Sequence, residues 1–121
     1  MNQSLEMTKI AYQALEEKLA EEIKVLDIRQ ISVIADYFII ANGKNKNQVQ
    51  AIVDNVQDAL QKAGYEMKQM EGYQNGTWVL IDFGDIVIHI FDQENRLFYD
   101  LRESGRTGWR SQWRPVSSPL L

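Results

Sequence analysis

The chain has 121 residues, 45% of them hydrophobic, and a formal net charge of −4, so it suits one domain with a true core and disfavours nucleic-acid binding mainly through phosphates. It contains no cysteine, which excludes disulfides, thiol nucleophiles and cysteine-based metal sites. No apolar run is long enough to span a membrane and residues 1–4 lack the pattern of a secretion signal, so we expect a cytoplasmic protein without membrane contact.

The first part of the chain shows one helical pattern and two strand patterns. Apolar residues recur at helical spacing from Leu5 to Leu19 and predict an amphipathic helix. Residues 23–27 predict a short strand. Residues 36–41 predict a second strand, and this run is apolar enough to be buried on both faces.

The middle of the chain carries the pattern of a capped helix. Asn45 is a candidate N-cap, the apolar positions within residues 49–63 follow helical spacing, and Gly64 is expected to end the helix. Residues 65–70 predict a third strand. Residues 94–101, with one apolar side, predict a short final helix or turn.

Residues 77–91 show the pattern of a β-hairpin. Two β-branched and aromatic runs are joined by Gly84-Asp85, and Gly84 can supply the positive φ of the first turn position. This turn predicts a wholly apolar core face of Val79, Ile81, Phe83, Ile86, Ile88 and Ile90. The opposite face pairs Trp78 with Phe91, Leu80 with His89, and Asp82 with Val87. Such a mixture of apolar, acidic and imidazole groups indicates a surface that meets a partner.

These patterns together predict an α/β domain with a mixed sheet of about five strands and packed helices. We expect it to occupy residues 1–103, followed by a basic, flexible C-terminal tail over residues 104–121. Residues 1–101 have a net charge of −7, and residues 102–121 a net charge of +3. An acidic body favours a basic partner. Besides the apolar hairpin face, the expected core includes Leu15, Leu19, Val25, Phe38, Ile40, Ile52, Val56 and Leu60.

Three ordered sequence blocks carry a resemblance to a known family. They are Asp36-Tyr37-Phe38-Ile39-Ile40-Ala41-Asn42-Gly43, residues 76–91, and Arg96-x-Phe98-Tyr99-x-Leu101. The blocks resemble the signatures of the Iojap/RsfS family, the ribosomal silencing factors, over most of residues 5–101. The resemblance implies a fold similar to that of nucleotidyltransferases. It also implies a protein that binds the large ribosomal subunit at its ribosomal protein number fourteen and stops the small subunit from joining.

The mixed hairpin face supplies the candidate partner-binding residues. Its aromatic and leucine side chains are expected to anchor the partner, and its acids to meet lysine or arginine. The candidates are Trp78, Leu80, Asp82, Asp85, His89 and Phe91, with Phe98 and Tyr99 at the margin. The same face could instead pair with a second copy and form a homodimer.

The alternative from another class is a nucleotidyltransferase-like enzyme or a nucleotide-binding protein. Two-metal chemistry needs clustered carboxylates, but Asp82 and Asp85 stand three apart across a turn, and Asn42-Gly43 occupies the place where that chemistry wants Gly-Ser. His89 has neither a cysteine nor a second histidine to complete a triad or an ordinary zinc site, which leaves only a single acid or base. We therefore expect no catalytic residue, metal or cofactor.

The C-terminal tail interleaves aromatic and guanidinium groups, which can stack on bases and pair with phosphates. It thus predicts a peripheral contact with ribosomal RNA, and the alternative is that its two tryptophans fold back onto the body. The candidate residues are Arg106, Trp109, Arg110, Trp113 and Arg114. The tail also departs from the family pattern, in which Leu-Trp usually follows the Tyr-x-Leu block closely. Here Arg102-Glu103-Ser104-Gly105 follows, and Trp109 comes later.

Overall fold

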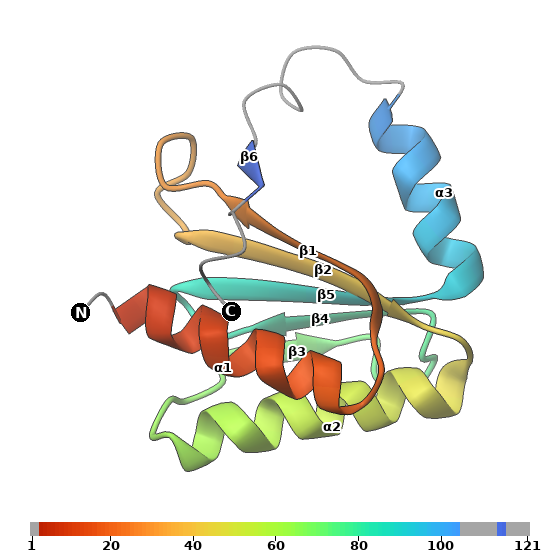
Figure 1. The fold of residues 1–121 in the computed structure, drawn as a ribbon, viewed down its shortest axis with the longest axis horizontal. Helices are drawn as coiled ribbons and strands as arrows, with labels where there is room; N and C mark the ends of the chain where they lie inside the picture. Colours follow the sequence, from red (N-terminus) through yellow and green to blue (C-terminus); the bar gives the residue numbers. More distant parts are fainter. Residues whose placement is uncertain (1–2, 105–113, 116–121) are drawn as a thin grey trace.

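The computed structural model describes residues 3–104 and 114–115, without the side chains of residues 98, 100–104 and 114–115. The described residues form three helices and six strands, which follow one another as Figure 1 shows. They are α1 (Gln3–Glu17), β1 (Glu21–Asp27), β2 (Tyr37–Gly43), α2 (Lys46–Lys62), β3 (Gln69–Glu71), β4 (Trp78–Asp82), β5 (Ile86–Asp92), α3 (Gln93–Ser104) and β6 (Arg114–Pro115).

The strands form one mixed sheet in the order β3-β4-β5-β2-β1-β6. The β2 and β5 strands run parallel, and all other neighbours are antiparallel. This confirms the predicted α/β fold with a mixed sheet of about five strands. The two-residue β6, which was not predicted, adds a sixth strand at the β1 edge.

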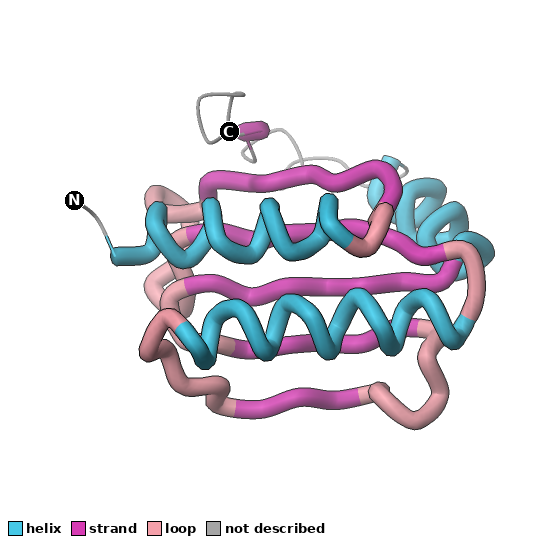
Figure 2. Tube along the Cα trace, turned by 60° about the horizontal axis from the view of Figure 1, so that its bottom comes forward, coloured by secondary structure: helices cyan, strands magenta, loops and turns pink. Residues whose placement is uncertain are grey.

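The two faces of the sheet are covered unequally. Helices α1 and α2 lie side by side across one face, as Figure 2 shows, and α3 lies against the opposite face at one end only. The core fills the space between the sheet and the α1–α2 layer. On the hairpin, Val79, Ile81, Ile88 and Ile90 are completely buried there. Burial of one such side chain stabilises the fold by roughly 1.5–3 kcal/mol.

Both ends of α2 are capped as the sequence predicts. The side chain of Asn45 accepts a hydrogen bond from the backbone N–H of Gln48, at 2.9 Å. At the other end Gly64 has a φ of +98°, and its N–H donates to the carbonyl of Gln61 while that of Tyr65 donates to Leu60. This paired arrangement satisfies the last helical carbonyls and requires a left-handed residue, which glycine adopts without strain.

The predicted core position of Leu19 is wrong. Helix α1 ends at Glu17, and Leu19 follows it in the left-handed region with a φ of +61°. Its side chain is 75% exposed. The N–H of Ala20 bonds back to the carbonyl of Leu15, so the chain has already turned out of the helix at the point where helical spacing would place Leu19 in the core.

The predicted strand over residues 65–70 is shorter than expected. Only Gln69–Glu71 pair with β4, although the N–H of Lys68 also bonds to the carbonyl of Asp82. The start of this segment serves the helices instead. Tyr65 caps α2 through its backbone, and its hydroxyl donates to the carboxylate of Glu6 on α1. These contacts direct the backbone away from the sheet.

Candidate partner-binding face

The predicted register of the hairpin is confirmed. Strands β4 and β5 pair Trp78 with Phe91, Leu80 with His89, and Asp82 with Val87. The turn residue Gly84 has a φ of +88°. Because side chains alternate along a strand, this register places these six residues on the face away from α1 and α2. We call this surface, the sheet side opposite α1 and α2, the open face.

Five rings form a continuous row on the open face, reaching from β2 to α3. His89 lies 4.5 Å from Phe38 and 5.8 Å from Trp78, measured between ring centroids. Phe91 stacks on Trp78 at 5.4 Å and contacts Tyr99 of α3 at 5.1 Å. We call this set the aromatic row. It brings together four of the predicted candidates, Trp78, His89, Phe91 and Tyr99, on one surface.

Solvent exposure differs along the aromatic row. Phe91 is buried where α3 covers the sheet, whereas Trp78 exposes 53% of its surface. Leu80 of β4 is partly buried and lies opposite His89 of β5. A large exposed indole beside partly covered apolar groups resembles the anchor residues of protein interfaces, which cluster around a desolvated centre.

Trp78 and His89 are joined by a hydrogen bond. The indole Nε1–H of Trp78 donates to Nδ1 of His89 at 2.8 Å. Burial lowers the pKa of His89 from 6.5 to about 4, because the surrounding apolar groups disfavour a charged imidazole. At neutral pH the ring is therefore uncharged and free to accept this bond.

The two predicted acids occupy different environments. Asp82 lies partly buried on the open face, and its Oδ1 accepts the N–H of Gly84 at 2.7 Å. Asp85 lies in the turn beyond the end of that face, where its carboxylate accepts from Gln3 of α1 at 3.1 Å. The structure thus places Asp82 on the open face and Asp85 apart from it, and a partner contact by either acid stays a prediction.

The remaining candidates lie at or beyond the limit of the described chain. Phe98 belongs to α3, but its side chain is outside the description. The predicted RNA-contacting residues 106, 109, 110 and 113 also lie outside the described residues. Arg114 is placed only through its backbone, which pairs with Asp27 of β1. Its side chain carries no structural statement.

Sequence-based prediction missed two parts of this surface. Phe38 was assigned to the core but lies partly exposed on the open face, against His89. The loop between β1 and β2 packs Ile28 and Ala35 against Val87 and the open face, and exposes the side chains of Ile31, Val33 and Ile34. Strand alternation along residues 37–43 could have separated Phe38 from the core, but the loop has no periodic pattern.

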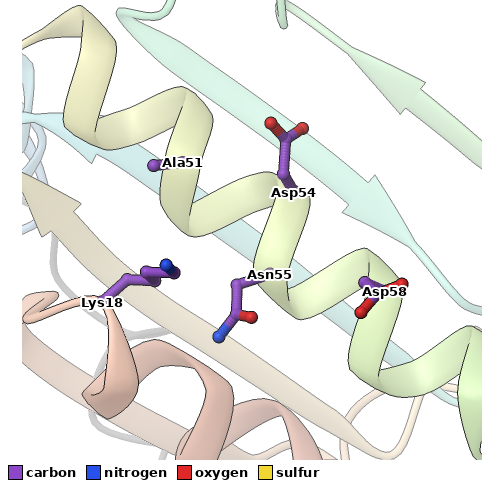
Figure 3. A pocket seen from close by; sticks show the side chains of 5 residues that line it. All are labelled: Lys18, Ala51, Asp54, Asn55 and Asp58. Atoms are coloured by element: carbon purple, nitrogen blue, oxygen red, sulfur yellow. The ribbon is translucent and has the colours of Figure 1, made fainter.

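The opposite side of the molecule offers a polar surface instead. Figure 3 shows a shallow pocket lined by Lys18 and by Ala51, Asp54, Asn55 and Asp58 of α2. Asn55 there ties the two helices together, donating to the carbonyl of Ala14 at 2.9 Å. Asp54 accepts the hydroxyl of Tyr73. Within residues 3–104 and 114–115 as described, no group of three histidine or acidic side chains is arranged to hold a metal ion.

The fold and this face define the class of protein: a single α/β sheet with one face covered by two helices and the other carrying a row of aromatic rings. Its sequence matches the family described as "RsfS: Ribosomal silencing factor during starvation" over residues 1–103. The chain belongs to this family.

Individual relatives agree with the family match. The chain is 43% identical over 103 residues to the Ribosomal silencing factor RsfS of Bacillus subtilis, covering 85% of this chain and 86% of that protein. It is 41% identical over 98 residues to the protein of the same name from Halalkalibacterium halodurans, covering 81% and 84%. A crystal structure from Bacillus halodurans superposes with a TM-score of 0.78 at 36% identity, covering 93% of this chain and 97% of that one.

Family membership decides between the two classes considered from the sequence. The family is regulatory and associated with the ribosome, so this protein is not an enzyme. The resemblance seen in the three sequence blocks is thereby confirmed. No helix in the described part of the chain is both long and apolar enough to cross a membrane.

Proposed function

We propose that the protein silences ribosomes in the cytoplasm by binding the large ribosomal subunit and blocking the small one. The open face would contact the ribosomal protein number fourteen of the large subunit. The block needs no chemistry, because a surface that is already occupied cannot receive the small subunit. The observation that carries the proposal is the aromatic row on the sheet face opposite α1 and α2, in a chain whose relatives are named ribosomal silencing factors.

The electrostatics of the chain support a basic protein partner. Residues 1–101 have a net charge of −7, and Asp82 places one of these acids beside the aromatic row. Complementary charge speeds the encounter and fixes orientation, while the buried aromatic anchors supply most of the affinity. A net negative charge of this size repels phosphate groups, which favours a protein contact for this part of the chain.

The tail is proposed to add a peripheral contact. Residues 102–121 carry a net charge of +3, opposite to the rest of the chain, and contain two tryptophans. Chains ending at Glu103 would then keep the main contact but lose affinity. Binding of these shortened chains would also depend less on salt concentration, because fewer phosphate contacts release fewer counterions.

Co-sedimentation with isolated large subunits tests the proposed face. Leu80→Ala should reduce binding at least tenfold, as loss of an interface anchor costs roughly 2 kcal/mol. Leu19→Ala is the matched control, since it truncates an exposed leucine just after the end of α1, one of the two helices on the opposite sheet face. Equal binding by both variants and the parent protein would refute the proposed face.

A second pair of variants tests the charge. Asp82→Asn keeps the oxygen that accepts the Gly84 N–H but removes the carboxylate charge, and it should weaken subunit binding most at low salt. Asp58→Asn, on the exposed side of α2, is its control.

A homodimer that uses the open face is the alternative outcome. It would appear as a doubled mass of the free protein that Leu80→Ala returns to the monomer.

A further inference from the structure

His89, the only histidine of the chain, lies within the open face rather than at its edge. It pairs with Leu80 across β4 and with Ile40 across β2. Rings flank it on both sides, with Phe38 at 4.5 Å and Phe91 at 6.2 Å between centroids. A polar ring in so apolar a position needs hydrogen-bond partners for both nitrogens.

The structure identifies the partner of one nitrogen only. An indole N–H can only donate, so Nδ1 of His89 must be the acceptor in the 2.8 Å bond from Trp78. An accepting Nδ1 carries no proton, and the neutral ring must therefore carry its proton on Nε2. The tautomer is fixed as an Nε2–H donor, and no acceptor within the described residues bonds to it.

The groups around His89 keep the ring neutral. Strand β2 faces it with Phe38, Ile40 and Asn42, none of which titrates. Strand β4 contributes Asp82, whose Oδ1 is engaged by the turn N–H of Gly84. Helix α3 contributes Tyr99, whose ring contacts Phe91, and the loss of water around the buried imidazole is what disfavours its charged form.

We propose that His89 is a recognition residue, whose Nε2–H donates to a hydrogen-bond acceptor that the partner protein places opposite the centre of the aromatic row. A backbone carbonyl or a side-chain amide or carboxylate oxygen fits this donor, whereas a lysine or arginine at that point is rejected. Its Nδ1 holds the exposed indole of Trp78 in place, so that an apolar group of the partner packs against a fixed surface. The inference rests on the proposed function and adds the chemistry of the partner group.

Three substitutions test the roles of Nδ1 and Nε2 of His89 separately. His89→Asn places an amide oxygen near the position of Nδ1, which can still accept from Trp78, but has no atom at the position of Nε2. His89→Gln reaches the Nε2 position with an N–H donor and does not reproduce the Nδ1 acceptor. His89→Phe keeps a ring of similar size and lacks both nitrogens.

The first measurement concerns the free full-length protein and needs no partner. In proton–nitrogen correlation spectra, the indole N–H signal of Trp78 is assigned by its loss in Trp78→Phe. The signal should shift in His89→Phe and remain near the parent position in His89→Asn. An indole signal that is unchanged in His89→Phe would contradict the assigned tautomer and overturn the inference.

The second measurement is sedimentation of the same variants with purified large subunits. Both His89→Phe and His89→Asn should bind about tenfold more weakly than the parent protein, the effect of one unmade buried hydrogen bond. His89→Gln should bind more tightly than His89→Asn, because it restores the donor. Parent-like binding by His89→Asn, or no gain in His89→Gln, overturns the inference.

The Leu80→Ala control distinguishes this inference from the proposed function. If Leu80→Ala loses binding while all three His89 variants bind normally, the proposed face stands and the hydrogen bond is refuted. If Leu80→Ala binds normally as well, the proposed face fails too. Protein-free ribosomal RNA is a further probe, and binding to it that depends on His89 would overturn a protein acceptor.

Discussion

The two faces of the β4–β5 hairpin come from the same fifteen residues but differ in burial. On one face Ile81 and Ile88 lie completely buried beneath α1 and α2. On the other, one step along each strand, Leu80 and His89 lie partly exposed, and Trp78 is 53% exposed. Alternation along the strand thus separates residues that fold the protein from residues that we propose to bind its partner.

The difference between the faces is one of coverage as much as composition. Both faces carry aliphatic or aromatic groups, but α3 covers only the end of the open face, near Phe91. The open face also contains the hydrogen-bonded Trp78 and His89 pair, which a closed core would not need. Apolar groups left open beside fixed polar atoms are typical of binding surfaces.

The largest expected effect is on stability at the covered face. Ile88→Ala or Ile81→Ala should lower the free energy of unfolding by about 2–5 kcal/mol, because each leaves a cavity in a fully packed core. Leu80→Ala, on the open face, should cost only about 1 kcal/mol. Thermal or denaturant unfolding of the three variants checks this. Equal losses in all three would invert the assignment of the faces.

The next effect is a dependence of stability on pH that His89 introduces. The folded protein takes up a proton on His89 only near pH 4, whereas the unfolded chain does so near pH 6.5. The unfolded state therefore binds more protons between these values, and stability falls as pH decreases through that window, by up to about 3 kcal/mol. Above pH 6.5 the full stability is present.

His89→Asn isolates this contribution, since the carboxylates titrate in both proteins. The loss of unfolding free energy between pH 7 and pH 4 should be smaller in the variant than in the parent. Urea unfolding at several pH values measures the difference. Parallel curves for the two proteins would show that His89 is not buried in its neutral form.

A smaller gain is expected where helix α1 ends. The backbone of Leu19 has a φ of +61°, and its side chain is 75% exposed. Leu19→Gly therefore removes the strain of a left-handed leucine and loses little buried apolar surface. The variant should unfold at a free energy higher by about 1 kcal/mol. Denaturant unfolding would reveal it, and a destabilised variant would mean that Leu19 packs in solution.

The smallest effect on stability is expected from removing the tail. The division of the chain after residue 103 stays a prediction, and a chain ending there should unfold within about 1 kcal/mol of the parent, because the pairing of β6 with β1 involves only two residue pairs at the sheet edge. Circular dichroism during thermal unfolding measures this. A collapse of the fold would show that residues 104–121 belong to the domain.

Much of the fold was predictable because local signals agreed with the final packing. Gly84 fixed the hairpin register, and Asn45 and Gly64 fixed the ends of α2. Leu19 was misplaced because helical spacing continues through it, although the backbone has already left the helix. Phe38 was misplaced because a run of apolar residues does not reveal which face a helix covers.

The site was predictable only in part, for a similar reason. The hairpin pattern placed Trp78, Leu80, Asp82 and His89 together, but it could not show that Asp85 bonds to Gln3 of α1. The bond between Trp78 and His89 depends on side-chain orientation and on the burial that keeps the imidazole neutral. These properties arise from tertiary packing, which periodicity does not encode.

The most direct test of the account is a subunit-joining experiment. Large subunits are incubated with the parent protein, Leu80→Ala or Leu19→Ala, small subunits are added, and joined ribosomes are measured by sedimentation. The account predicts that the parent and Leu19→Ala block joining, while Leu80→Ala, still folded by its thermal unfolding curve, allows it. Joining that is blocked equally by Leu80→Ala and the parent would contradict the central claim that the open face does the silencing.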